Sequence, residues 1–115
     1  MRTIPSSELI INADGSIFHL HLKPEQLADI VILVGDPGRV AMISDYFDTK
    51  ECEVANREFL TVTGTYKGKR MTVMSTGIGI GNIDICVTEL DALANIDFAT
   101  RKVKDTFRQL TLVRL

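Results

Sequence analysis

The sequence predicts an α/β fold, in which strands and helices alternate around a sheet. A continuous β-branched run over residues 29–34 is typical of a strand buried on both faces. Glycine-containing turns at 35–38 and 75–81 each lead from a strand-like segment into one with helical spacing. Between them, residues 59–66 and 70–75 are strand-like and are joined by only three residues, which predicts a hairpin. This order of elements is typical of an α/β sheet.

The segment before the buried strand is expected to be mostly irregular. Residues 1–15 predict an extended arm that ends in a turn at Asn12-Ala13-Asp14-Gly15. Residues 16–22 (SIFHLHL) alternate apolar and polar side chains as a strand does, so their two histidines would share one face. Residues 23–28 predict a single helical turn, with Pro24 near its start because proline suits the first helical positions.

Two helices and a strand are expected around the hairpin. Apolar residues at helical spacing predict a helix over 39–47 and another over 82–93. Residues 51–55 predict a strand. Residues 100–109 predict a polar amphipathic helix that turns Val103 and Phe107 inward.

The last segment, residues 110–115 (LTLVRL), reads as a buried strand, and nothing follows that would cover it. An uncovered apolar edge strand tends to pair with another chain. We therefore expect a single incomplete domain over residues 1–115, and we expect a fragment of this kind to associate with itself.

Composition narrows the function classes. The 115 residues are 45% hydrophobic and 24% charged with a net charge of −2, which is enough for one domain with a real core. Basic residues are scattered, so neither nucleic acid nor a membrane surface is an expected partner. No run approaches the roughly 18 apolar residues of a membrane span, and no signal peptide is recognisable. Cys52 and Cys86 lack metal spacing and fit reduced thiols of a cytoplasmic protein.

The GDPGR turn over residues 35–39 is the first candidate site. Glycine lets the backbone approach a ligand closely, a helix N-terminus presents free N–H groups, and Arg39 adds a planar guanidinium that matches phosphate oxygens. The same letters also fit a tight turn in which Pro37 opens the helix and Arg39 is solvated. The second glycine turn, 75–81, fits either a ligand cradle or close packing of strand and helix.

Four further side chains have two interpretations each. Arg57 beside Glu58 could be an exposed pair without a role. Arg114 inside an apolar strand needs a partner if it is buried, either a bound anion or a carboxylate. His19 and its neighbour two positions on could bind a metal, but no third ligand is visible and a structural role is favoured.

Taken together, these residues resemble the uridine phosphorylase branch of the nucleoside phosphorylases. The matching stretches are IFHLHL, VILVGDPGRV, NREFLTVTGTYKGKRMTVMSTGIGIGN and VTELDAL, and they follow the family's order from about residue 8 to the end. The segment TELDALANIDF is particularly similar to bacterial uridine phosphorylases. The resemblance implies the N-terminal part of the nucleoside phosphorylase fold, truncated here, with a mixed central sheet flanked by helices.

The resemblance also implies site residues. In the family, the glycine and arginine of the GDPxR turn bind phosphate, which implies Gly35 and Arg39 here. The arginine of REF, here Arg57, reaches the same phosphate from the neighbouring subunit, and Arg114 matches a further phosphate-binding arginine at a strand end. The histidine of the FHL motif, here His19, reaches a neighbour's ribose 5′-hydroxyl.

The implied reaction is phosphorolysis of uridine, in which inorganic phosphate attacks the anomeric carbon and releases uracil and ribose 1-phosphate. Phosphate is then a substrate, no cofactor is expected, and no covalent catalytic residue is needed. Nucleoside, phosphate and further copies of the chain are the expected partners, because family members are ring-shaped oligomers built on dimers with shared active sites.

The chain also departs from the family. Family members are more than twice as long, and the absent part carries the residues that recognise the base. A purine nucleoside phosphorylase or a nucleosidase therefore stays open, although three phosphate-facing arginines argue against a nucleosidase, which uses water. The 115 residues alone are expected to be inactive. In some relatives Glu58, Ile78 and the residue at Asn82 line a monovalent-cation site, and whether a metal binds here is left open.

Overall fold

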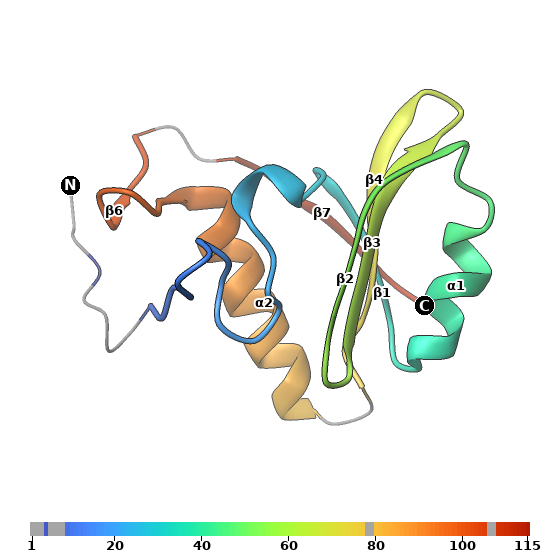
Figure 1. Ribbon diagram of the computed structural model, residues 1–115, viewed down its shortest axis with the longest axis horizontal. Helices are drawn as coiled ribbons and strands as arrows, with labels where there is room; N and C mark the ends of the chain where they lie inside the picture. Colours follow the sequence, from blue (N-terminus) through green and yellow to red (C-terminus); the bar gives the residue numbers. More distant parts are fainter. Residues whose placement is uncertain (1–3, 5–8, 78–79, 106–107) are drawn as a thin grey trace.

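The computed structural model describes residues 4, 9–77, 80–105 and 108–115. Its centre is a five-stranded sheet with the strand order β2-β3-β4-β1-β7 (Figure 1). The sheet is mixed, because β1 is parallel to β4 and β7 whereas β3 is antiparallel to β2 and β4. The elements are a 3-10 helix Pro24–Gln26, β1 Ile30–Val34, α1 Pro37–Ser44, β2 Thr49–Asn56, β3 Phe59–Tyr66, β4 Lys69–Ser75, α2 Ile80–Asn95, β5 Ile96–Asp97, β6 Lys102–Val103 and β7 Thr111–Arg114. The predicted α/β class and mixed sheet are confirmed.

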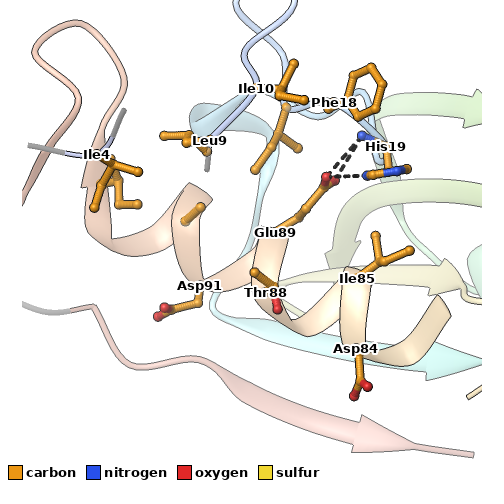
Figure 2. A pocket seen from close by; sticks show the side chains of 13 residues that line it. Ile4, Leu9, Ile10, Phe18, His19, Asp84, Ile85, Thr88, Glu89 and Asp91 are labelled. Carbon is orange, nitrogen blue, oxygen red and sulfur yellow. Dashed lines mark hydrogen bonds and ion pairs between the residues drawn. The ribbon is translucent and has the colours of Figure 1, made fainter. Parts of the chain in front are cut away.

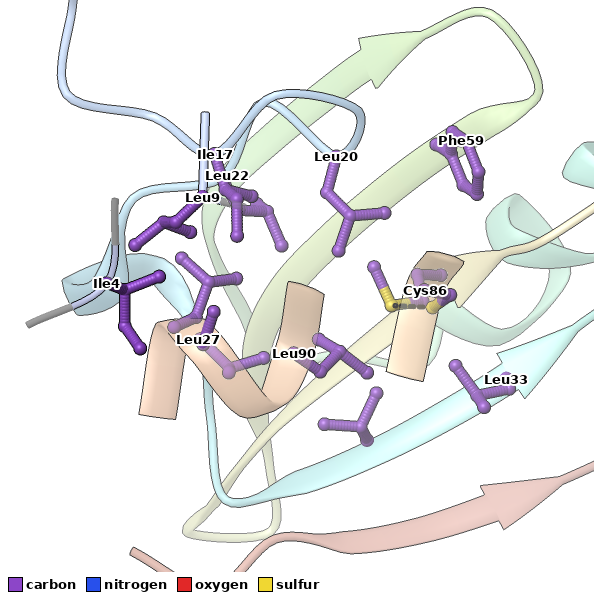
Figure 3. Close-up of a cluster of buried hydrophobic side chains, with 14 residues drawn as sticks. Ile4, Leu9, Ile17, Leu20, Leu22, Leu27, Leu33, Phe59, Cys86 and Leu90 are labelled. Atoms are coloured by element: carbon purple, nitrogen blue, oxygen red, sulfur yellow. Dashed lines mark hydrogen bonds between the residues drawn. The ribbon is translucent and has the colours of Figure 1, made fainter. Parts of the chain in front are cut away.

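Helices cover both faces of the sheet, which places β1 in the interior (Figure 1). Val31 and Leu33 of β1 point to the face covered by α2 and the N-terminal arm (Figure 3). Val34 points to the opposite face, where it packs with Val40 of α1. Burying the side chains of one strand on both faces requires the continuous apolar run seen in the sequence.

The β3–β4 hairpin is also confirmed, with a turn at Lys67 and Gly68. Both residues have left-handed backbone, with φ of +50° and +81°. This is the geometry of the short turns whose twist matches that of the flanking strands. The Lys67 amide donates to Asp48 Oδ2 at 2.8 Å, which ties the turn to the segment before β2.

The predicted helix over residues 100–109 is wrong for the residues that the structure describes. Residues 96–97 and 102–103 instead pair as the short antiparallel strands β5 and β6. The Asp97 carboxylate accepts the amides of Ala99 and Thr100, at 2.9 and 3.3 Å, and Arg101 has a φ of +61°. A side chain that takes up these amides favours a turn over a helix. Phe107 lies outside the described residues.

The predicted strand over residues 16–22 is also wrong. It keeps one isolated bridge, between Ile17 and Ile11, and then turns over residues 18–20. His21 follows with a φ of +57°, which no strand residue adopts. As a result His19 and His21 do not share a strand face.

The last strand, β7, pairs with β1 and is exposed along its length, contrary to the burial that its sequence predicts. Leu112, Val113 and Leu115 are between 40 and 60% exposed. No helix among the described residues has the length and apolar character needed to span a membrane.

The two thiols are expected to differ in reactivity, because Cys86 is buried and Cys52 is half-buried. Burial, with a smaller contribution from the Glu89 charge, raises the pKa of the Cys86 thiol to about 12. Only about one thiol in ten thousand is then ionised at pH 8, and the thiolate is the reactive form. We expect iodoacetamide to modify half-buried Cys52 in the folded chain and Cys86 only in denaturant, as measured by peptide mass spectrometry. Equal labelling rates in buffer would contradict this expectation.

Candidate functional site

Four chain segments meet at one edge of the sheet. Because β1, β4 and β7 are parallel, their carboxyl ends lie together. The turn before β3 reaches the same edge, since β3 is antiparallel to β4. Gly35 follows β1, Gly77 follows β4, Arg114 ends β7, and Arg57 with Glu58 forms the turn. Ligands of open α/β sheets bind outside the carboxyl ends of parallel strands, so this edge is the candidate site.

Gly35 and Arg114 lie side by side at this edge. A Cβ atom at position 35 would be 3.6 Å from Arg114 Nη2 and 3.6 Å from the carbonyl oxygen of Gly77. The Thr76 amide donates to the Val34 carbonyl at 2.8 Å, which joins the ends of β1 and β4. One guanidinium and the backbone of both glycine turns therefore share a single surface.

The start of α1 has fewer free amide groups for binding an anion than the sequence suggests. Asp36 is its N-cap, and the Asp36 carboxylate accepts the Gly38 amide at 2.9 Å. Pro37 has no amide hydrogen, and the Arg39 amide donates to the Asp36 carbonyl at 3.0 Å. The first-turn amides are thus already used, so an anion here depends on Gly35 and on the exposed Arg39 side chain.

The turn between β2 and β3 is fixed to the end of β4. Ser75 Oγ donates to the Glu58 carbonyl at 2.6 Å and accepts the Leu60 amide at 2.9 Å. Arg57, the first residue of the turn, has a φ of +54°, in the left-handed region that favours glycine. Such a conformation in a non-glycine residue costs energy and is found preferentially at functional sites.

Glu58 and Asn82 close around Gly77. A Cβ atom at position 77 would lie 3.0 Å from Asn82 Nδ2 and 3.1 Å from Glu58 Cγ, and the φ of Gly77 is +73°. Glycine is favoured at this position on both conformational and steric grounds. Ile78, the third residue considered for a cation site, is outside the described residues. Within them, no group of three or more His, Cys, Asp or Glu side chains is placed to hold a metal ion.

The arginines at this edge differ from the others in the described chain. Arg39, Arg57 and Arg114 are exposed, and no described carboxylate or carbonyl pairs with their guanidinium groups. The remaining described arginines each donate to carboxylate or carbonyl oxygens, and they are Arg70, Arg101 and Arg108. Unpaired guanidinium groups are available to an anion, because no protein acceptor competes for their N–H groups.

His19 is held next to the same turn. Asn56 Nδ2, adjacent to Arg57, donates to the His19 carbonyl at 2.8 Å. On the other side, His19 Nδ1 lies 2.8 Å from Glu89 Oε2 of α2 (Figure 2). Both residues line a cavity of about 410 Å³ between α2 and the N-terminal arm.

Sequence reasoning did not identify Glu89. One signal was present: Glu89 stands three residues after Cys86 and four before Leu93, within the buried stripe of α2. An acid at a core position requires hydrogen-bond donors, which predicts a specific partner. The sequence does not show which residues provide them.

The predicted site residues therefore fall into two groups. Arg114 lies beside Gly35, and Arg39 follows in the first turn of α1. Arg57 and His19 are joined through Asn56 instead. Convergence of the three arginines on one phosphate stays a prediction.

The chain is similar to several known proteins. A family model described as the phosphorylase superfamily matches residues 29–101, which include Gly35, Arg39 and Arg57. The uridine phosphorylase of Thermococcus kodakarensis is 40% identical over 88 residues, covering 76% of this chain and 32% of that protein. A DeoD-type purine nucleoside phosphorylase of Colwellia psychrerythraea is 42% identical over 73 residues, covering 63% and 31%.

A solved structure is similar over more of the chain. The Trypanosoma brucei nucleoside phosphorylase, described as showing uridine phosphorylase activity, has a TM-score of 0.80 and 45% sequence identity. The match covers 84% of this chain and 30% of that one. The chain thus spans about a third of the length of the relatives it matches.

Proposed function

The chain belongs to the phosphorylase superfamily, and we propose that the whole protein cleaves uridine with inorganic phosphate to give uracil and ribose 1-phosphate. The observation that carries the proposal is the position of the Arg114 guanidinium, 3.6 Å from where a Cβ atom of residue 35 would lie, at an edge where three exposed arginines have no described protein partner. The family supports the reaction class, and the exposed guanidinium groups at this edge support a phosphate site there.

The chemistry suits such an edge. Breaking the glycosidic bond leaves positive charge on the sugar, and a phosphate dianion held below the ring is both nucleophile and electrostatic partner. The planar N–H groups of Arg114 match two phosphate oxygens, and Gly35 lets the backbone approach a third. The protein then acts by positioning and charge, without a covalent nucleophile.

We propose uridine rather than a purine nucleoside as the substrate because of how much of the chain matches the uridine-cleaving relatives. The Thermococcus kodakarensis uridine phosphorylase matches over 88 residues, against 73 for the Colwellia psychrerythraea purine enzyme and 84 for that of Anoxybacillus flavithermus. The Trypanosoma brucei enzyme, with its described uridine phosphorylase activity, matches 84% of the chain. The identities to the uridine and purine enzymes, 40% and 42%, do not separate the two classes, so the substrate must be measured.

We assign Arg57 and His19 to the site of a neighbouring copy of the chain. This assignment is supported by the position of Asn56, which links the two residues. Asn56 directly precedes Arg57, and its side chain donates to the His19 carbonyl at 2.8 Å. Two segments joined in this way can bring a phosphate-binding side chain and a nucleoside-binding side chain together to an interface.

The test is a phosphorolysis assay of the protein at its full encoded length, with uridine, inosine and methylthioadenosine each supplied with and without phosphate. We expect phosphate-dependent release of uracil from uridine and no comparable release of hypoxanthine from inosine or of adenine from methylthioadenosine. Turnover of inosine alone would assign a purine enzyme, release without phosphate would assign a nucleosidase, and no turnover would refute the proposal. The 115-residue chain alone is expected to be catalytically inactive in this assay. Native mass spectrometry measures whether it self-associates.

Arg57 offers a separate test, because its backbone conformation favours glycine whereas the proposed phosphate site requires its guanidinium group. Replacing Arg57 by glycine relieves a left-handed backbone that costs a non-glycine residue about 1 kcal/mol. We expect Arg57→Gly to fold at least as stably as the wild type while its KM for phosphate rises about tenfold. Thermal unfolding and phosphate kinetics measure the two effects.

Arg57→Ala is the matched control, since it removes the guanidinium and keeps the strained backbone. It is expected to match Arg57→Gly in KM and to be the less stable of the two. A wild-type KM for phosphate in both variants would contradict the proposed role of Arg57 in phosphate binding.

A further inference from the structure

Glu89 has an unusual set of partners. Its side chain is only 11% exposed, and its carboxylate accepts the backbone amides of His19 and Leu20, at 3.1 and 2.9 Å. The same carboxylate lies 2.8 Å from His19 Nδ1 (Figure 2). One nearly buried acid of α2 thus holds both the backbone and the ring of a residue 70 positions away.

This contact determines which ring nitrogen of His19 carries the proton. A carboxylate only accepts hydrogen bonds, so His19 Nδ1 must donate. In a neutral imidazole the other nitrogen, Nε2, is then an acceptor without a proton. The Phe18 and His19 rings pack edge to face, with their centroids 4.7 Å apart. This packing further restricts the rotation of the His19 ring.

We propose that Glu89 is a positioning residue for the nucleoside: it keeps the proton of His19 on Nδ1 and presents Nε2 as an acceptor for a hydroxyl donor. The inference rests on the proposed function, in which that donor is the ribose 5′-hydroxyl. Asn56 completes the arrangement by fixing the His19 carbonyl from the side of Arg57. Glu89 acts on the substrate only through His19.

Glu89→Gln is the informative substitution because it preserves size and removes one acceptor. The amide oxygen of glutamine still accepts the backbone amides of His19 and Leu20, while its NH₂ group faces Nδ1. Nδ1 must then accept, and the proton moves to Nε2. We expect the tautomer of His19 to switch from Nδ1–H to Nε2–H while the fold is kept.

Nitrogen-15 NMR of the histidine rings measures this directly in the chain itself, above pH 8, where an ordinary imidazole is neutral. A His21→Asn background leaves His19 as the remaining histidine, and asparagine tolerates the left-handed backbone there. Asp84→Asn is the matched control, because Asp84 is exposed on the same helix, lines the same cavity and carries the same charge. An Nε2–H or doubly protonated ring in the wild type, or no switch in Glu89→Gln, would overturn the proposal.

Kinetics provide a second readout that a general structural defect would not produce. In the full-length protein, Glu89→Gln is expected to lower kcat/KM about tenfold for uridine and to leave that for 5′-deoxyuridine unchanged. An equal loss for both nucleosides would overturn the positioning role. If the wild type turns over no nucleoside, the proposed function fails, and the tautomer measurement still decides whether Glu89 sets the proton of His19.

Discussion

Arg114→Ala is expected to lower kcat/KM for phosphate about 100-fold while the protein stays folded. Removing one preorganised donor from a site where charge develops typically costs about 2.7 kcal/mol or more, which corresponds to this factor. The side chain is exposed and has no described protein partner, so its loss leaves no buried group unsatisfied. Initial rates at varied phosphate and saturating uridine, with thermal unfolding in parallel, measure both effects.

Two comparison variants make the result specific. Arg114→Lys keeps the charge and loses the planar pair of donors, so it is expected to recover only part of the rate. Arg70→Ala removes an arginine that is already paired with Glu51, 2.9 Å away, and with carbonyls of the chain. It is expected to lower stability and to leave the phosphate KM unchanged. An unchanged phosphate KM in Arg114→Ala would contradict the phosphate site.

Local patterns predicted the sheet well. The hairpin strand β3 has the predicted bounds, 59–66, because alternation and a short turn are properties of neighbouring residues. The buried strand β1 was recognisable for the same reason, since its continuous apolar run requires cover on both faces. Residues 100–109 were misassigned because the helical spacing there competes with the Asp97 carboxylate, which captures amides and favours a turn.

The candidate site was only partly predictable. Gly35 and Arg39 belong to one turn, so spacing marks them as a candidate site with a plain tight turn as the alternative, whereas the position of Arg114 beside Gly35 depends on the parallel pairing of β1 with β7. The sequence also suggested free amides at the start of α1, but the neighbouring Asp36 carboxylate takes one of them. Long-range pairing and side-chain competition are decided by the tertiary fold, which a local pattern does not specify.

Gly64→Ala is expected to produce the largest loss of stability among these variants, about 3 kcal/mol. A Cβ atom at position 64 would lie 2.3 Å from the Thr49 carbonyl oxygen and 2.6 Å from Phe47 Cδ2. The first of these is backbone of β2, so β2 and β3 must separate locally. For a chain of about this size the melting temperature should fall by more than about 10 °C, as measured by calorimetry or circular dichroism.

Gly68→Ala separates steric from conformational causes. Gly68 has a φ of +81°, and a Cβ atom added there would have no other atom within 4 Å, so alanine brings backbone strain without a collision. Such strain costs about 1 kcal/mol. Gly64 has no such φ, and a purely conformational account predicts almost no effect of alanine there. Equal losses in the two variants would therefore refute the steric argument. A larger loss of stability in Gly64→Ala would show that the close approach of β2 and β3 stabilises this pair of strands, which the Arg57 turn connects.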